Sequence, residues 1–87
     1  MAKELIGEVS HFFGKINVAA LKLTGELKIG DKVSIEHKDG SVVLEQAIDS
    51  MQIDMKPVES AKAGEDVAIK VSSHVHEGNL VYKITEE

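Results

Sequence analysis

Short segments rich in Val and Ile, separated by tight-turn residues, are the feature of this chain that most limits its possible folds. Most of the turn signals contain glycine, several of them next to an acidic or amide residue. They are Gly14, Gly25, Gly30-Asp31, Asp39-Gly40, Lys56-Pro57, Gly64-Glu65 and Gly78-Asn79. β-Branched segments bounded in this way favour strands over helices.

Alternation of apolar and polar residues supports this interpretation. Residues 32–36 and 67–71 alternate cleanly, so each strand would turn one face toward a core, and residues 80–84 fit less well. The stretch 16–23 changes phase after Ala20, which predicts a bulge or a strand buried on both faces.

Residues 42–53 also change phase, and Leu44, Ile48 and Met51 have helical spacing. The preceding Asp39-Gly40 is a strong hairpin signal that requires a partner strand, so we predict a bulged strand with a positive φ at Gly40. The one helical turn that we expect lies at 58–63, between Pro57 and Gly64.

These elements predict an all-β protein, an antiparallel Greek-key barrel of about six to seven strands in one domain over residues 1–87. Closure into a barrel would remove exposed sheet edges. We expect a mostly aliphatic interior, because the chain contains two Phe, one Tyr and no Trp. The predicted interior residues are Leu27, Ile29, Val33, Ile35, Ile48, Met51, Val67, Ile69 and Val71.

Composition excludes several classes of function. The ten basic residues are all lysines against fifteen carboxylates, for a net charge of −5, so tight autonomous binding of nucleic acid is not expected. The absence of cysteine excludes a disulfide framework and cysteine-based zinc or thiolate chemistry. No apolar run is long enough to cross a membrane, and the expected location is the cytoplasm.

Two histidines, His74 and His76, are the clearest chemical signal. In an extended segment their side chains share a face and Glu77 follows, so they are candidate ligands for zinc or nickel. A third ligand, such as His11 or His37, would have to come from elsewhere in the chain. The alternative is a solvated loop between two strands.

A binding surface is the other candidate site. Phe12 and Phe13 are adjacent in a predicted hairpin, so one should face the core and the other is a candidate partner contact. Lys15, Lys56 and Lys62 fall in predicted loops and are candidate contacts to a partner. For the phenylalanines, the alternative is a plug at the end of the barrel. For the lysines, the alternative is a solvated surface of mixed charge.

Several segments resemble domain 2 of the translational GTPases, the elongation-factor β-barrel. Residues 25–33 (GELKIGDKV) are similar to that family's short connection from one strand into the next. Residues 63–71 (AGEDVAIKV) are similar to a later strand of the family's barrel. Weaker similarities occur at 13–18, 48–51 and 77–81, so the resemblance extends over about residues 5–85. Asp66 departs from the family's usual Asn, and Leu21, Lys22 and Thr24 replace its arginines.

The resemblance implies a docking barrel, with a link to translation. No phosphate-binding loop is present, because Gly14-Lys15 lacks the required glycine at Val9, and nucleotide binding is therefore not expected. We predict a non-enzymatic module without a cofactor that binds a protein or ribonucleoprotein, such as a ribosome- or tRNA-associated assembly. The alternatives are an accessory metal-binding protein and a subunit of an RNA-modifying or U32 peptidase-like complex, since a similar barrel occurs in some U32 proteins.

Overall fold

Strands and turns make up the whole of the computed structural model in residues 2–85, the part of the chain that it describes, and no helix occurs there. The strands are β1 (Ala2–Phe13), β2 (Val18–Leu23), β3 (Leu27–Lys28), β4 (Lys32–Glu36), β5 (Val42–Ala47), β6 (Met51–Ile53), β7 (Lys56–Pro57), β8 (Ser60–Ala61), β9 (Asp66–Lys70) and β10 (Leu80–Thr85). The described residues accordingly include no helix that meets the length and apolarity of a membrane span.

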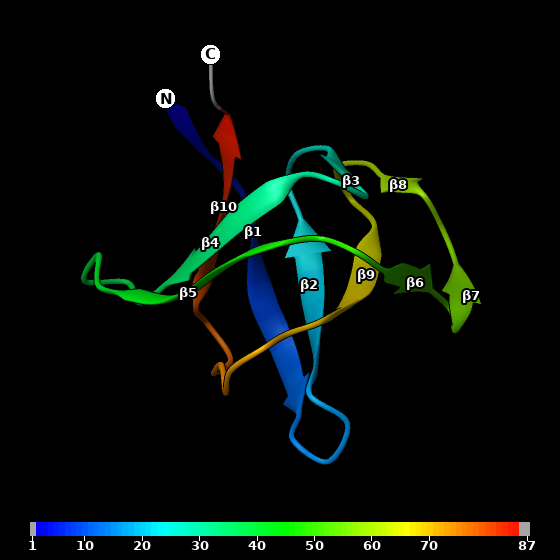
Figure 1. Cartoon of the computed structure of the whole chain (residues 1–87), viewed down its shortest axis with the longest axis horizontal. Coiled ribbons are helices and arrows are strands. Elements are labelled where there is room, and N and C mark those ends of the chain that lie inside the picture. The colour runs from blue at the N-terminus through cyan, green and yellow to red at the C-terminus, as the bar shows by residue number, and fades with distance from the viewer. Residues whose placement is uncertain (1, 86–87) are drawn as a thin grey trace.

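Eight strands form one sheet in the order β5-β4-β10-β1-β2-β9-β6-β7, and β3 pairs with β8 in a second, two-stranded sheet. All pairs are antiparallel. Figure 1 shows the large sheet curling, so that β4 and β5 cross in front of β1 and β2. The all-β, antiparallel prediction is confirmed. The helical turn expected at 58–63 is wrong, because that segment contains β8, whose Ala61 pairs with Leu27 of β3.

Bulges set which side chains face inward. The register shifts in β1 between Leu5 and Gly7 and again between Val9 and His11. β2 itself has no register shift and alternates regularly, with Ala19, Leu21 and Leu23 buried, so the bulge predicted within residues 16–23 lies in the partner strand β1 instead. The strand predicted at 42–53 is confirmed only in part, because residues 48–50 interrupt it: it forms two strands, β5 and β6, with a shift in β5 opposite Glu36.

Three turns share one arrangement of glycine and a side-chain oxygen. In the segments 28–31, 62–65 and 76–79, the third residue is a glycine with φ of +97°, +90° and +89°. The backbone N–H of the fourth residue donates to the carbonyl of the first at 3.1 Å. In return, the side chain of the fourth residue accepts from the N–H of the first, at 2.7–2.9 Å. This reciprocal pair explains why glycine precedes Asp, Glu or Asn at these reversals.

The β4–β5 hairpin uses a different turn. Gly40 has φ of +95°, as predicted, and its N–H donates to the carbonyl of His37 at 2.9 Å. Asp39 has no positive φ, so the connection is a three-residue loop with a left-handed glycine rather than a type I′ turn. The Asp39 carboxylate accepts from both the backbone N–H and the hydroxyl of Ser41, which lowers its pKa.

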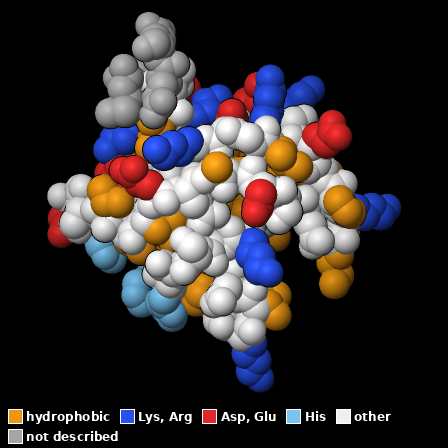
Figure 2. Space-filling view, in the orientation of Figure 1, with side chains coloured by type: hydrophobic (Ala, Val, Ile, Leu, Met, Phe, Trp, Pro, Cys, Tyr) orange, Lys and Arg blue, Asp and Glu red, His pale blue; other side chains and the backbone are white. Residues whose placement is uncertain are grey.

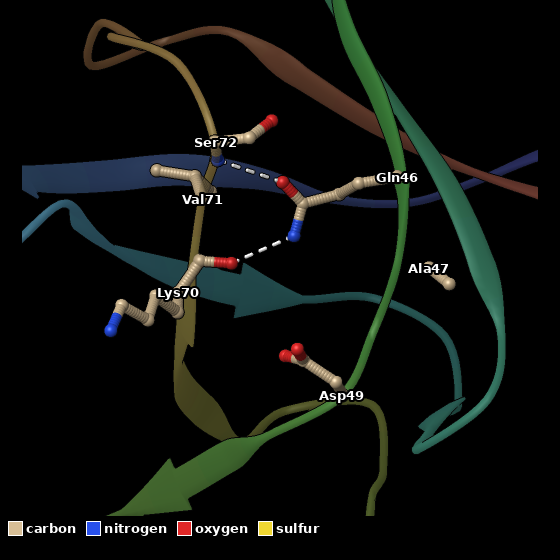
Figure 3. A pocket seen from close by; sticks show the side chains of 6 residues that line it. All are labelled: Gln46, Ala47, Asp49, Lys70, Val71 and Ser72. Atoms are coloured by element: carbon tan, nitrogen blue, oxygen red, sulfur yellow. Dashed lines mark hydrogen bonds between the residues drawn. The ribbon is translucent and has the colours of Figure 1, made fainter.

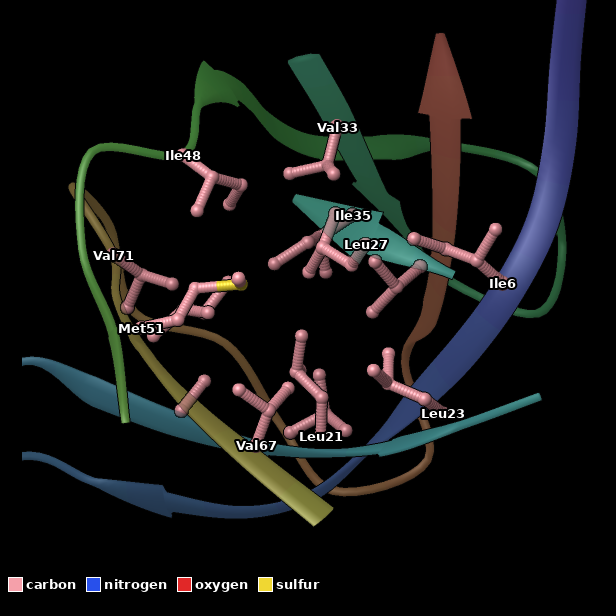
Figure 4. Packing of buried hydrophobic residues seen from close by; sticks show 14 of the residues in the cluster. Ile6, Leu21, Leu23, Leu27, Val33, Ile35, Ile48, Met51, Val67 and Val71 are labelled. Atoms are coloured by element: carbon pink, nitrogen blue, oxygen red, sulfur yellow. The ribbon is translucent and has the colours of Figure 1, made fainter. Parts of the chain in front are cut away.

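An aliphatic core fills the inside of the curled sheet (Figure 4). Eight of the nine predicted interior residues are buried there, together with residues from β1, β2 and the loop after β9 that were not predicted. The exception is Ile29, which is 44% exposed. Its prediction fails because the chain already reverses at 28–31, so period-two alternation from Leu27 no longer applies at residue 29.

The sheet is not closed into a barrel by strand pairing, so the expected closure is not found in the described residues. The edges of the sheet are β5 and β7. Between β5 and the end of β9, the side-chain amide of Gln46 crosses the gap: its Nε2 donates to the carbonyl of Lys70 at 2.7 Å and its Oε1 accepts from the N–H of Ser72 at 2.9 Å (Figure 3). A side chain therefore takes the place of a ladder between these two strands.

One carboxylate is buried on the opposite face of β4 from the core. Glu36 is 3% exposed and accepts hydrogen bonds from Lys3 at 2.6 Å and from the Ser34 hydroxyl at 2.8 Å. The Lys3 ammonium also lies 4.9 Å from the centre of the Tyr82 ring. The hydrogen bond from Lys3 lowers the pKa of Glu36, and the same bond raises the pKa of Lys3. This contact ties β1 to β4 across the intervening β10.

Replacing Gly40 tests the left-handed turn. A Cβ at Gly40 would meet nothing within 4 Å, so the cost of Gly40→Ala is conformational and should lower the free energy of unfolding by about 1 kcal/mol. Gly14→Ala is the matched control, because Gly14 has no positive φ and its added Cβ makes only ordinary contact. Urea denaturation of both variants measures the difference. Equal stabilities would show that the turn is wrongly described.

The ion pair between the exposed Lys3 and the buried Glu36 predicts a pH dependence of stability. Because folding lowers the pKa of Glu36 from its ordinary 4.5, its contribution is present above that value and is lost as pH falls through the folded pKa. The variant Glu36→Gln should be less stable than the wild type at pH 7, and the two should converge as pH falls below 4.5. Thermal denaturation between pH 7 and pH 3 measures this convergence. A constant difference over that range would contradict it.

Candidate functional site

Most of the side chains identified as candidates from sequence meet at the end of the molecule that carries the β1–β2 turn. The end of β1 contributes His11, Phe12 and Phe13, and the loop between β9 and β10 contributes His74 and His76. We call these five residues the aromatic end. Figure 2 shows histidine side chains gathered beside hydrophobic atoms on the lower part of the molecule.

The rings of the aromatic end contact one another in two groups. His11 and Phe13 lie edge to face with centroids 4.4 Å apart, and Phe12 and His74 do so at 4.5 Å. His74 and His76 follow at 4.7 Å in a tilted arrangement. Edge-to-face contacts of this kind place the positive edge of one ring against the electron-rich face of another. Four of the five rings, but not that of Phe13, line a shallow depression of about 290 Å³ together with Val75 and Glu77.

The bulge in β1 decides which phenylalanine faces outward. Val9 is buried in the core, so strict alternation would turn His11 and Phe13 inward. The extra residue at the register shift reverses this order: Phe12 pairs with the buried Ala19 and packs against the core, while Phe13 is 45% exposed. The sequence predicts that one phenylalanine ring faces inward and the other outward. The bulge determines that Phe12 is the inward one and Phe13 the outward one.

A buried valine orients the two loop histidines. Val75 is 0% exposed and belongs to the core, so its neighbours His74 and His76 both lie on the outside. The following turn holds this loop in place, since the Asn79 side chain accepts from the N–H of His76 at 2.7 Å. The sequence-based interpretation of the segment as a solvated loop missed Val75, because one valine among polar residues gives no periodic signal.

The metal hypothesis gains one neighbouring histidine but no complete ligand set. His11 reaches the same end of the molecule, where its Nδ1 lies 3.1 Å from the Glu77 carboxylate. His37 does not line that depression; it contacts the turn after His76, where its Nδ1 lies 3.1 Å from the side-chain amide of the buried Asn79. Within residues 2–85 no group of three or more His, Cys, Asp or Glu side chains is placed to hold a metal ion. Coordination by His74 and His76 therefore stays a prediction.

The structure does not bring the three candidate lysines together. Lys15 lies in the β1–β2 turn at the aromatic end, whereas Lys56 is in β7 and Lys62 follows β8. In Figure 1 the β1–β2 turn is at the bottom, and β7 and β8 lie at the right and upper right. All three side chains are exposed. A single basic patch built from them is therefore not present.

Comparison with known proteins gives three informative results. No protein-family model matches the chain. A protein of Methanocaldococcus jannaschii named as an uncharacterized protease is 44% identical over 81 residues, which cover 93% of this chain. The chain spans 20% of the length of that curated relative.

The solved structures are more distant in sequence and close in shape. The C-terminal domain of a Geobacillus thermoleovorans protein assigned to the U32 peptidases superposes with a TM-score of 0.85, at 18% identity, over 94% of this chain and 93% of that one. The chain shares the fold of that domain. A selenomethionine variant of the same domain gives a TM-score of 0.82 over 90% of this chain and 96% of that one.

These results correct two expectations. The identification with domain 2 of the translational GTPases is wrong, and with it the implied role in translation, because the comparisons point to a U32 peptidase C-terminal domain. The expectation of a non-enzymatic module is also wrong, since the relative is named as a protease. The alternative that named a U32 peptidase-like protein is the one that the comparisons support.

The two phenylalanines should respond differently to truncation. Phe12→Ala should lower the free energy of unfolding by about 2 kcal/mol, because Phe12 packs against the core. Phe13→Ala should change it by less than about 1 kcal/mol, because the ring is 45% exposed. Chemical denaturation of both variants measures the contrast. A larger loss for Phe13→Ala would show that the bulge does not orient the strand as described.

Proposed function

We propose that this chain is a binding module that works together with the catalytic part of a U32 peptidase-like protein. The observation that carries the proposal is the 44% identity to a protein named as a protease, of which the matching segment is only a fifth. The likeness in fold to a separately solved C-terminal domain also supports a role as a compact unit attached to a larger protein.

The aromatic end is the surface that best suits such binding. Exposed aromatic side chains supply contact area at a low cost in side-chain entropy, and they are frequent among residues that dominate binding energy. Phe13 is the more exposed of the two phenylalanines. Its ring contacts that of His11, and the ring of Phe12 contacts that of His74. The nearby Ile16, 60% exposed in the β1–β2 turn, extends the apolar area.

A protein partner fits the electrostatics better than RNA does. The net charge of −5 repels a polyanion at long range, and the chain has no arginine for bidentate contacts to phosphate. The dispersed positions of Lys15, Lys56 and Lys62 add to this argument. We therefore propose the catalytic body of the U32 peptidase-like protein as the partner.

Reconstitution of the M. jannaschii relative tests this proposal. A version of that protein lacking the segment matched by this chain should bind the isolated chain in a calorimetric titration. Phe13→Ala should weaken the affinity about tenfold or more, because an anchoring ring would lose its contact. Lys62→Ala is the control and should leave the affinity unchanged.

Three results would contradict the proposal. Failure of the two proteins to bind at concentrations up to about 10⁻⁴ M would contradict the partnership itself. Equal effects of Phe13→Ala and Lys62→Ala would contradict the assignment of the aromatic end. Binding of tRNA by the isolated chain, with a stronger effect of the lysine variant, would favour RNA instead.

A further inference from the structure

The end of β9 presents an unpaired strand edge to the gap next to β5. The N–H of Val71 donates to the carbonyl of Asn17 at 2.9 Å, on the side of β2. In an extended strand, the neighbouring carbonyl of Lys70 and N–H of Ser72 must then point to the other side. That side faces the gap between the end of β9 and β5, which we call the seam. Its lining residues are Gln46, Ala47, Asp49, Lys70, Val71 and Ser72.

Gln46 occupies the position of a missing strand. One residue of a parallel neighbouring strand would donate its N–H to the Lys70 carbonyl and accept from the Ser72 N–H. The Gln46 amide makes these same two bonds, at 2.7 and 2.9 Å. Both bonds are exposed to solvent, so another amide can replace them at little net cost.

We propose that the seam binds an extended peptide segment that displaces the Gln46 side chain. The depression measures about 320 Å³, and β5 on its other side is an edge of the sheet with backbone groups of its own available for pairing. The occupant is a polypeptide backbone, because the groups that face the seam are one backbone acceptor and one backbone donor spaced as in a β-ladder.

Charge in the seam selects the side chain of that peptide. Figure 3 shows the Asp49 carboxylate directed into the space between the two strands, while the ammonium group of Lys70 is turned away from it. A basic side chain of the bound segment would therefore lie near Asp49, and an acidic one would be repelled. The occupant is an extended segment with a lysine or arginine. This inference is independent of the proposed partner, because it concerns a different surface and is tested on the isolated chain.

The experiment is a nuclear magnetic resonance titration of the ¹⁵N-labelled chain with the peptide acetyl-Val-Lys-Val-Thr-Val-amide. We expect chemical-shift changes at the backbone amides of Val71 and Ser72 and at the side-chain amide of Gln46. The expected dissociation constant is on the order of 10⁻⁴ M, as for a short flexible peptide that must be ordered on binding. Shifts confined to other surfaces, or no shifts up to millimolar peptide, would overturn the proposal.

Removing the competing side chain should strengthen binding. Gln46→Ala frees the Lys70 carbonyl and the Ser72 N–H, so the affinity should rise roughly fivefold. Gln52→Ala, at an exposed glutamine of β6, is the matched control and should leave it unchanged. The spectrum of each variant also reports whether it remains folded. Unchanged or weaker binding by a folded Gln46→Ala variant would overturn the displacement mechanism.

The variant Asp49→Asn tests the preference for a basic side chain. The peptide acetyl-Val-Glu-Val-Thr-Val-amide should bind the wild type several-fold more weakly than the lysine peptide, and Asp49→Asn should remove most of that difference. If wild type and Asp49→Asn prefer the lysine peptide equally, the role of Asp49 is overturned. The backbone contact is tested separately, by the Gln46→Ala variant.

Discussion

The reciprocal hydrogen bonds of the three glycine-containing turns control most of the architecture. Each turn uses a left-handed glycine to reverse the chain, and an Asp, Glu or Asn oxygen then satisfies a backbone N–H that would otherwise be unpaired. The turns end directly before β4, β9 and β10, so they fix where those strands begin. The 76–79 turn in addition holds the loop in which Val75 enters the core between two exposed histidines.

The same turns explain why one part of the structure could be predicted from the sequence and another part could not. Glycine followed by an oxygen-bearing side chain, with alternating residues on either side, is sufficient to predict several of the longer strands and eight of the 17 buried core residues. Features that arise from pairing between distant strands leave little local signal. The bulge that turns Phe12 inward and the solvent-facing edge at Lys70 depend on partner strands, so the sequence alone did not determine them.

The mistaken family identification has a related physical origin. A segment such as residues 25–33 must reverse direction twice within a few residues while it places Leu27 and Val33 in the core, and few residue types meet those requirements. Unrelated β proteins with similar strand connections can therefore share short motifs. Agreement over most of the chain, as with the M. jannaschii relative, is the better guide to ancestry.

The pairing of the first strand with the last has a mechanical consequence. Ala2 pairs with Thr85 at one end of the antiparallel β1–β10 ladder, and both ends of the described chain lie at the same corner in Figure 1. A pulling force applied across these two ends acts along the hydrogen bonds of that ladder, which run perpendicular to the strands. The bonds are then loaded and broken one after another, as in a zipper, instead of sharing the load as they do under shear. Tension between these two ends should therefore open the β1–β10 ladder at a lower force than tension applied along the strands.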